Sequence, residues 1–519
     1  MIRAIKAAEL KNRLAGEAEL ALLDVREQGV HHGGHPFFAC CAPLSRLELV
    51  IADLVPRRAA PLVLLDGGDE GLAEAAAERL LALGYTDVAV LEGGCAGWRD
   101  AGRELFSGVN VPSKAFGEFV ENHYGTPHIG PEELRRLSAE RRVLIVDSRP
   151  FDEYHRMNIP GGIDMPGAEL AWRVHDLAPD PAMLVVVNCA GRTRSIIGCQ
   201  SLRNAGIPNP VVALKDGTMG WELAGFAVER GAKRVAPPPS TAGKAKALAA
   251  AERVAARFGV KFASPPDLRE WQADAGRTLY LLDVRTQEEF EHERLAGSRH
   301  APGGQLVQAT DEYLGVRNAR VVLADRERVR GVMTASWLNQ MGWNEVYVLA
   351  DWRGLELESG RRQAPVPGLQ KWKTVAPAGV AGTVLDLSTS LRFQARHIPG
   401  AWWAVRSRLD EARERLPDET ALVLTSEDGL LAHLAAPQAA ALWPTADVKV
   451  LDGGNAAWFA AGLATAYGME RATTTTDDVA YKAYDHKSDY HRHARDYLRW
   501  EVALMEQMKR EPAIRFRTY

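Results

Sequence analysis

The fold of this chain is decided by a stretch that it repeats four times: Leu22-Leu-Asp-Val-Arg26, Leu144-Ile-Val-Asp-Ser-Arg149, Leu281-Leu-Asp-Val-Arg285 and Leu385-Asp-Leu-Ser388. Each copy is followed by a turn rich in glycine and proline and then by a second, fully apolar stretch, at residues 62–65, 184–187, 321–323 and 421–424. Continuous runs of Val, Leu and Ile predict strands that are buried on both faces of a parallel sheet.

The spacing of the copies is regular. From the first aspartate to the residue at the end of the second strand there are 42 positions in three copies (24 to 66, 147 to 189, 283 to 325) and 40 in the fourth (386 to 426). A tryptophan follows 32 positions later in three copies, whereas Trp352 of the third copy follows after 27. Ala/Leu-rich helices separate the strands. The pattern therefore predicts an α/β fold of four tandem domains, each a small parallel sheet with helices on both faces.

Shifts in composition give the expected domain boundaries. We expect domains at residues 1–106, 107–232, 233–363 and 364–468, and a C-terminal tail at residues 469–519 that is helical through 489–509. Linkers are expected near 106–127, at the proline-rich stretch 235–240 that leads into a helix near 242–258, and near 364–378. The first domain is the best candidate to pack against the second, and the charged tail is a candidate element for oligomerisation.

Composition excludes several classes of protein. The net charge is −4 with 25% charged residues, which gives no basic surface for nucleic acid. No apolar run is long enough to cross a bilayer, and the amphipathic start does not resemble a signal sequence, so we expect a cytoplasmic protein. Five cysteines without a CxxC pair support neither a disulfide framework nor a zinc site.

One loop carries the chemistry. In open parallel sheets, ligands bind beyond the carboxyl ends of the strands. The residues at the end of the second strand of each copy are Asp66, Cys189, Asp325 and Ser426. The second copy alone offers a thiol there, so Cys189 is the candidate nucleophile.

The residues after Cys189 favour a thiolate. Gly191 allows successive backbone N–H groups to converge, and a helix expected to begin near Ser195 adds its positive end. Arg192 and Arg194 add two positive charges, and the thiolate is the reactive form of cysteine. The candidate substrate-binding residues of this loop are Ala190, Gly191, Arg192, Thr193, Arg194 and Ser195.

The repeat resembles the rhodanese domain, and Cys189-Ala-Gly-Arg-Thr-Arg194 is similar to the six-residue active-site loop of that family. The whole chain resembles bacterial proteins with four tandem rhodanese domains and a single active cysteine. The resemblance implies that Cys189 takes a sulfane sulfur from a small anionic donor, with thiosulfate favoured, and passes it as a persulfide to a thiol or to cyanide. It implies no metal and no organic cofactor. Arg173 lies in the segment that borders the pocket in this family, so both a substrate contact and a surface role stay open for it.

The first, third and fourth copies depart from this pattern. Asp66 or Asp325 would repel anions, and the loop that starts at Ser426 lacks both the thiol and the arginines, so these copies are expected to be inactive. Asp147 and Arg149 recur, at least in part, in copies without the cysteine, which favours a structural role. Cys199 is expected in the core, with a resolving-thiol role left open.

Two other functions stay open. Cysteine phosphatases and arsenate reductases need a Cys-x5-Arg loop, whereas Cys189 to Arg194 gives Cys-x4-Arg, with Asn188 where phosphatases usually carry a histidine. A non-enzymatic sulfur carrier or scaffold is the other alternative, supported by the three substituted copies and opposed by the intact loop of the second.

Overall fold

The computed structural model describes residues 2–417, 420–486 and 488–519, and they form two compact units. The first unit contains Met1–Leu10, Leu22–Val109 and Ala364–Tyr481, and the second contains Lys11–Ala21, Asn110–Gln363 and Lys482–Tyr519. The first and fourth copies thus belong together, and the second copy is grouped with the third copy and the tail. Packing of the second copy against the first stays a prediction.

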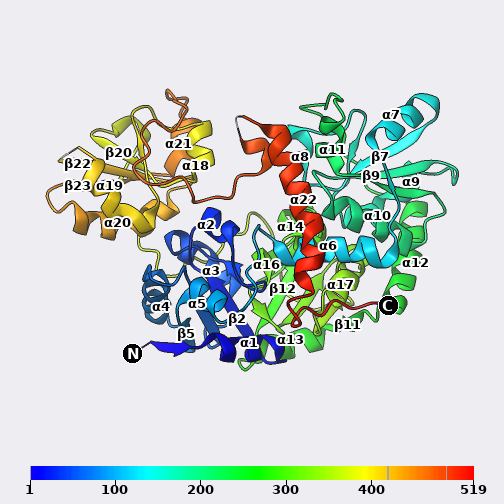
Figure 1. Cartoon of the computed structure of the whole chain (residues 1–519), viewed down its shortest axis with the longest axis horizontal. Coiled ribbons are helices and arrows are strands. Elements are labelled where there is room, and N and C mark those ends of the chain that lie inside the picture. Colours follow the sequence, from blue (N-terminus) through cyan, green and yellow to red (C-terminus); the bar gives the residue numbers. More distant parts are fainter. Residues whose placement is uncertain (1, 418–419, 487) are drawn as a thin grey trace. The chain divides into compact units, whose positions relative to one another are not determined.

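The second copy, cyan to green in Figure 1, is built on a parallel sheet with the strand order β6-β10-β9-β7-β8. Its strands are β6 (His128–Ile129), β7 (Val143–Asp147), β8 (Ile163–Asp164), β9 (Leu184–Asn188) and β10 (Val211–Leu214). Its helices are α6 (Val111–Tyr124), α7 (Pro131–Glu140), α8 (Phe151–Arg156), α9 (Glu169–Leu177), α10 (Thr193–Ala205) and α11 (Gly217–Leu223).

Both faces of this sheet are buried, as the apolar runs predicted. Val185 and Val187 of β9 pack with Val146 on one face, whereas Val186 packs with Ile145 on the other. Since side chains alternate along a strand, a strand covered on both sides must be apolar at every position. The sheet ends where Asp147 of β7 aligns with Asn188 of β9.

The other copies repeat this topology, which confirms four tandem α/β domains. Their strand orders are β1-β5-β4-β2 with β3 beside β2 in the first copy, β11-β17-β16-β12-β14 in the third and β19-β23-β22-β20-β21 in the fourth. The first copy contains β1 (Arg3–Ile5), β2 (Leu20–Asp24), β3 (Cys40–Cys41), β4 (Leu62–Leu65) and β5 (Val88–Leu91), with α1 (Ala7–Ala15), α2 (Gln28–Gly33), α3 (Leu47–Leu54), α4 (Leu72–Ala82) and α5 (Gly94–Asp100).

The third and fourth copies have the following bounds. The third contains β11 (Lys261–Ala263), β12 (Leu279–Asp283), β13 (Arg294–Leu295), β14 (Arg299–His300), β15 (Val316–Arg317), β16 (Arg320–Ala324), β17 (Val346–Leu349) and β18 (Leu357–Glu358), with α13 (Pro265–Ala273), α14 (Gln287–His292), α15 (Gly303–Gln308), α16 (Thr310–Tyr313) and α17 (Val329–Gln340). The fourth contains β19 (Thr374–Val375), β20 (Thr383–Asp386), β21 (Trp402–Trp403), β22 (Ala421–Thr425) and β23 (Asp447–Leu451), with α18 (Ser390–Ala395), α19 (Leu409–Arg415), α20 (Leu430–Leu442) and α21 (Gly454–Ala460).

The recurring tryptophans are structural. In each case the indole Nε1 donates to the backbone oxygen six residues later, at 2.9 Å for Trp98, Trp221 and Trp458. These three residues lie on α5, α11 and α21. In the third copy β17 leads into turns where the other copies have that helix, and there Trp352 lies beneath the guanidinium of Arg285. The irregular spacing of the third copy thus reflects a different chain path after its last sheet strand.

The repeated Asp-x-Arg pattern is also structural. Arg149 donates to both carboxylate oxygens of Asp147, at 2.8 and 2.7 Å, and to the backbone oxygen of Met157. Arg26 and Arg285 make the equivalent contacts in the first and third copies. The pair therefore closes the turn after the first long strand, whether or not the copy carries the cysteine.

Some helices lie in the stretches that the sequence assigns to linkers and to the C-terminal tail. The stretch expected as a linker at 106–127 contains α6, whereas α12 (Thr241–Arg257) and α22 (Tyr490–Met508) agree with the helices expected near 242–258 and 489–509. Among the described residues, no helix is both long and apolar enough to span a bilayer.

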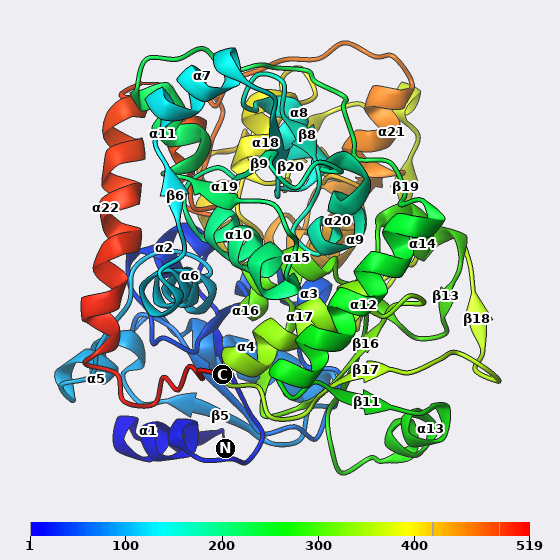
Figure 2. The same ribbon diagram turned by 90° about the vertical axis from the view of Figure 1, so that its right-hand side faces the viewer.

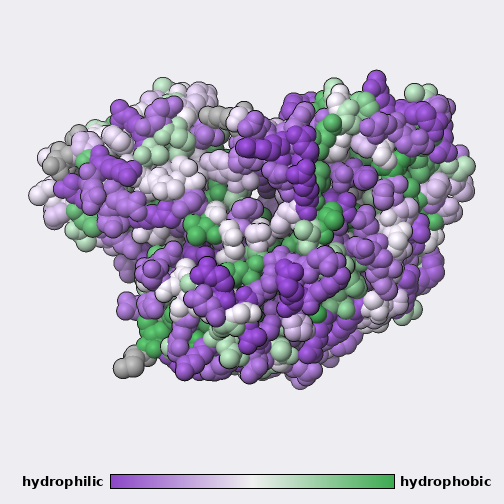
Figure 3. All heavy atoms as spheres, in the orientation of Figure 1, coloured by the Kyte–Doolittle hydropathy of each residue, from purple (hydrophilic) through white to green (hydrophobic). Residues whose placement is uncertain are grey.

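The tail helix α22 is amphipathic. It buries Ala494, Leu498, Glu501 and Leu504, which recur at helical spacing on one face. Figure 2 shows α22 running past α6, against which it packs. On the side of the molecule drawn in Figure 3, hydrophilic residues predominate over α22.

Candidate active site

Cys189 directly follows β9 at the carboxyl end of the sheet, and it is only 2% exposed. Its backbone oxygen accepts hydrogen bonds from the N–H of Thr218 at 2.8 Å and from the Thr218 hydroxyl at 3.0 Å. Gly217, with a φ of +57°, lies so close that a Cβ atom there would be 2.5 Å from the same oxygen. The start of α11 thus fixes the backbone of the nucleophile.

The predicted loop residues lie together at this point. Helix α10 begins at Thr193, two positions before the start expected from the sequence, so a short loop connects Cys189 to a helix N-terminus. The hydroxyl of Ser195 donates to the backbone oxygen of Arg192 at 2.8 Å and holds the first turn. Unpaired N–H groups at a helix start favour a negative charge, which is what a thiolate or a bound anion brings.

Arg192 is engaged by carboxylates. Its guanidinium donates to both oxygens of Glu118, at 2.7 and 2.8 Å, and to Asp216 at 3.2 Å. Glu121 is a further partner. The arginine therefore joins the loop to α6 and to the segment before α11, and its charge is balanced by acids that the sequence pattern did not indicate.

Arg194 is engaged in the same way. It forms a bidentate pair with Glu153 of α8, at 3.0 and 2.8 Å, and a hydrogen bond to Gln305 at 3.2 Å. Burial acts to raise the pKa of Glu153, but the charge and hydrogen bonds of Arg194 hold that pKa well below its usual value. Both loop arginines are therefore ion-paired.

The tail helix α22 lies against the loop. A Cβ atom added at Gly191 would be 3.1 Å from Cε1 of Tyr497 and 3.3 Å from Oε2 of Glu501. The hydroxyls of Thr193 and Tyr497 donate to Oε1 of Glu501, at 3.1 and 2.9 Å. Sequence reasoning missed these tail residues. The signal was Glu501 itself, a carboxylate on the otherwise apolar face of an amphipathic helix.

A second residue missed from the sequence is Lys114 of α6. Its ammonium lies 3.4 Å from Oε1 of Glu501, and the residue is 9% exposed. Burial lowers the pKa of Lys114, whereas the charges of Glu501 and Cys189 act to raise it. The composition of the stretch around Lys114 predicts a linker, and no sequence pattern connects it with the nucleophile.

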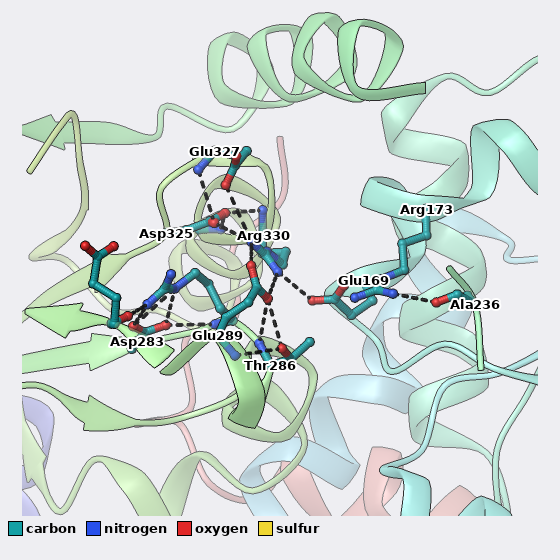
Figure 4. A network of polar contacts seen from close by, with 12 residues as sticks. Glu169, Arg173, Ala236, Asp283, Thr286, Glu289, Asp325, Glu327 and Arg330 are labelled. Carbon is teal, nitrogen blue, oxygen red and sulfur yellow. Dashed lines mark hydrogen bonds and ion pairs between the residues drawn. The ribbon is translucent and has the colours of Figure 1, made fainter. Parts of the chain in front are cut away.

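Arg173 has a different set of contacts. It pairs with Glu169, one turn before it on α9, and it donates to the backbone oxygen of Ala236. Glu169 in turn accepts a hydrogen bond at 3.1 Å from Arg330 of the third copy (Figure 4). Arg173 thus belongs to a polar network that connects the second and third copies.

The equivalent loop of the third copy is filled by its own side chains. Asp325, which replaces the cysteine, pairs with Arg330 at 2.9 Å, and Arg330 also donates to Glu289. Figure 4 shows this arginine at the centre of a ring of carboxylates. In the first copy, Asp66 accepts the N–H groups of residues 68, 72 and 73, at 2.9 to 3.1 Å. In these two copies a carboxylate accepts the hydrogen bonds that the loop would otherwise have to donate to an anionic substrate.

Cys199 lies in the core of the second copy. It is fully buried within α10, its thiol faces the backbone oxygen of Pro127 at 3.8 Å, and burial raises its pKa to about 12. A thiol with so high a pKa is unreactive at neutral pH. This favours the core role over that of a resolving thiol.

Comparison with known proteins agrees with this geometry. The model of the rhodanese-like domain family matches residues 6–101, 130–224, 264–351 and 371–461. A crystal structure of thiosulfate sulfurtransferase from Pseudomonas aeruginosa is 48% identical, covers 100% of both chains and superposes with a TM-score of 0.95. An HTH-type transcriptional regulator of Mycobacterium tuberculosis is 37% identical over 100 residues, which are 19% of this chain and 43% of that protein. The chain thus spans less than half the length of this curated relative. Because the family model matches all four copies, the chain belongs to the rhodanese-like domain family.

Proposed function

We propose that this chain is a sulfurtransferase that carries sulfane sulfur as a persulfide on Cys189. The observation that carries the proposal is the position of this thiol in the loop between the end of β9 and the start of α10. The equivalent loops of the first and third copies are filled by carboxylates. The likeness to a thiosulfate sulfurtransferase across the full chain supports thiosulfate as the donor.

The proposed reaction has two steps. The Cys189 thiolate attacks the sulfane sulfur of thiosulfate, a new S–S bond forms, and the bond to the central sulfur breaks so that sulfite leaves with the electron pair. The thiolate of an acceptor, or cyanide, then attacks the outer sulfur of the persulfide, and the Cys189 thiolate leaves. Neither step requires a metal or an organic cofactor.

The loop residues have distinct proposed roles. The backbone N–H groups of Ala190, Gly191 and the first turn of α10 would hold the sulfur and the oxyanion of the donor. Since Arg192 and Arg194 are each ion-paired with carboxylates, we assign them to holding the loop in shape. Their direct contact with the donor stays a prediction. The cytoplasmic location and oligomerisation through the tail remain predictions.

A cysteine phosphatase or arsenate reductase is the weaker alternative. The loop from Cys189 to Arg194 is one residue shorter than such enzymes need, and it is tightened by α11 on one side and α22 on the other. A non-enzymatic sulfur carrier or scaffold is supported by the substituted loops of the other copies and opposed by the intact loop of the second copy.

Intact mass spectrometry after incubation with thiosulfate tests the proposal. The wild type should gain one sulfur atom, mapped to the peptide that contains Cys189, with release of sulfite during this loading, and should transfer that sulfur when cyanide or a thiol is added. Cys199→Ser should behave as the wild type, whereas Cys189→Ser should do neither. Sulfur loading in Cys189→Ser, or hydrolysis of an aryl phosphate that depends on Cys189, would overturn it.

A further inference from the structure

The catalytic loop differs from its three counterparts in exposure to solvent. Every residue from Cys189 to Ser195 is buried or only partly exposed. Each equivalent loop in the other copies has exposed residues, which are Asp69, Glu70 and Gly71 in the first copy, Arg326 and Arg328 in the third and Asp428 in the fourth. The loop that bears the nucleophile is thus the covered one, although a substrate must reach it.

Side chains of the C-terminal tail cover this loop. Ala190, next to the nucleophile, belongs to an apolar cluster whose tail members are Ala483, Tyr490, Ala494, Tyr497 and Leu498. A Cβ atom at Gly191 would be 3.7 Å from Cδ2 of Leu498, and Thr193 donates a hydrogen bond to Glu501 at 3.1 Å. We call these five tail members, together with Glu501, the tail cover.

The tail is held in place by three helices of the second copy. Arg156 of α8 donates at 3.3 Å to Asp485 of the short 3-10 helix η4 (Ala483–Asp485). The hydroxyl of Tyr490 donates to Glu222 of α11, and α22 packs along α6 (Figure 2). The two hydrogen bonds lie at exposed or part-buried positions. Contacts of this kind open more readily than those of a sheet core, so the tail is the part of the site that can move.

Transfer of sulfur to an acceptor requires access to an atom beneath the tail cover. The acceptor attacks the outer sulfur of the persulfide, a new bond to that sulfur forms, and the Cys189 thiolate leaves with the electron pair of the broken S–S bond. Cys189 itself is only 2% exposed. Cyanide or a small thiol needs little room, whereas a cysteine of a folded protein brings its own backbone and neighbouring side chains, for which Tyr497 and Leu498 leave no space.

We propose that the tail cover is the size filter of the Cys189 loop: it lets sulfur pass to small acceptors and excludes the thiol of a folded protein while the tail is in place. The choice of acceptor rests on the proposed sulfurtransferase function, whereas the shielding of the thiol does not. The tail thereby has a role at the active site that does not depend on oligomerisation.

Two maleimides of different size test the shielding in the full chain. N-ethylmaleimide and a maleimide joined to a polyethylene glycol chain form the same thioether, and each reaction is followed as the loss of the unmodified Cys189 peptide. In the wild type the bulky reagent should react at least about tenfold more slowly, because it needs the tail to open. Leu498→Ala should raise the rate of the bulky reagent about tenfold relative to the small one, since loss of a packed side chain favours opening.

Two further variants separate opening of the tail from loss of folding. Leu504→Ala is the matched control and should keep the wild-type ratio, because Leu504 is fully buried on the same helix but is not a member of the described cluster that contains Ala190. Tyr490→Phe keeps the ring, removes the hydrogen bond to Glu222 and should raise the ratio about threefold. Each variant must keep the circular dichroism spectrum of the wild type.

Two outcomes of the maleimide experiment would overturn the inference. One is a bulky reagent that reacts with wild-type Cys189 as fast as the small one. The other is a ratio of rates that is the same in the wild type, Leu498→Ala and Tyr490→Phe.

The acceptor test uses the persulfide loaded from thiosulfate, with cyanide, glutathione and reduced thioredoxin as acceptors. The wild type should pass sulfur to cyanide and glutathione faster than to thioredoxin, and Leu498→Ala should favour thioredoxin by the same factor by which it favours the bulky maleimide. Equal rates for glutathione and thioredoxin in the wild type would overturn the size filter. A chain that takes no sulfur from thiosulfate but keeps the difference between the maleimides would refute the proposed function and leave the shielding intact.

Discussion

Asp325 and Arg330 form a buried ion pair at 2.9 Å, and they are separated by the same five positions as Cys189 and Arg194. In the second copy the arginine at this spacing, Arg194, pairs with Glu153 and not with the residue that begins the loop, which is Cys189. In the third copy Arg330 is fully buried, and the carboxylate of Asp325 beside it fills the loop. The same loop position thus serves a nucleophile in one copy and a structural ion pair in the other.

Introducing a cysteine in the third copy should therefore not create activity there. We expect Asp325→Cys to take up no sulfur at position 325, because Glu289 and Glu169 keep Arg330 in the loop. The change should lower the free energy of unfolding by about 3 kcal/mol, since one carboxylate of a buried ion-pair network is lost. Intact mass after thiosulfate treatment and urea unfolding measure the two effects. A second sulfur atom mapped to position 325 would contradict this account.

Gly191 should be sensitive to a single methyl group. In Gly191→Ala the new Cβ would meet Tyr497 at 3.1 Å and Glu501 at 3.3 Å, so either the loop or α22 must shift. A displacement near the nucleophile should slow sulfur loading on the order of tenfold to a hundredfold. The rate of sulfur loading from thiosulfate measures this. The matched control is Gly33→Ala, where an added Cβ meets nothing within 4 Å. Equal rates for the two variants would show that α22 does not restrain the loop.

Asp164 should make the stability of the protein depend on pH. Its carboxyl group is 3% exposed, and burial, followed by the charge of Asp147, raises its pKa from 3.8 to about 7. The folded chain then holds a proton between about pH 4 and pH 7 that the unfolded chain has released. Stability should accordingly fall as pH rises through this range, on the order of 2 to 4 kcal/mol.

The variant Asp164→Asn tests this assignment, because a carboxamide stays neutral at every pH in the range. Urea unfolding at pH 5 and pH 8 should show a smaller difference for Asp164→Asn than for the wild type, with the variant the more stable of the two at pH 8. Asp152→Asn, at an exposed position on α8, is the control and should keep the wild-type difference. An unchanged difference in Asp164→Asn would contradict the raised pKa.

The sequence predicted what is local and repeated. The strands, their order along the chain and the position of Cys189 follow from apolar runs and a constant spacing, because a parallel sheet places every strand end at the same edge. The contacts that complete the site are not local. Thr193 and Glu501 are 308 positions apart, and Lys114 lies in a stretch whose composition indicated only a linker. No periodicity connects such residues, so their meeting is visible only in the folded chain.

The same limit applies to Arg173, which family resemblance places at the pocket and the structure places beside Glu169 and the backbone oxygen of Ala236. If these contacts define its role, Arg173→Met should leave the KM for thiosulfate and the rate of sulfur loading unchanged. It should lower the free energy of unfolding by about 1 to 3 kcal/mol, because a carboxylate and a carbonyl each lose a donor in a part-buried network.

Steady-state sulfurtransfer and urea unfolding of Arg173→Met distinguish the two roles. Arg353→Met is the matched control, since the side chain of Arg353 is 90% exposed and its ion pair with Asp351 should contribute little to stability. A rise in the KM for thiosulfate in Arg173→Met without loss of stability would establish a substrate contact. In that case the guanidinium would have to leave Glu169 when the donor binds, and the network that connects α9 to Arg330 would have to open during each turnover.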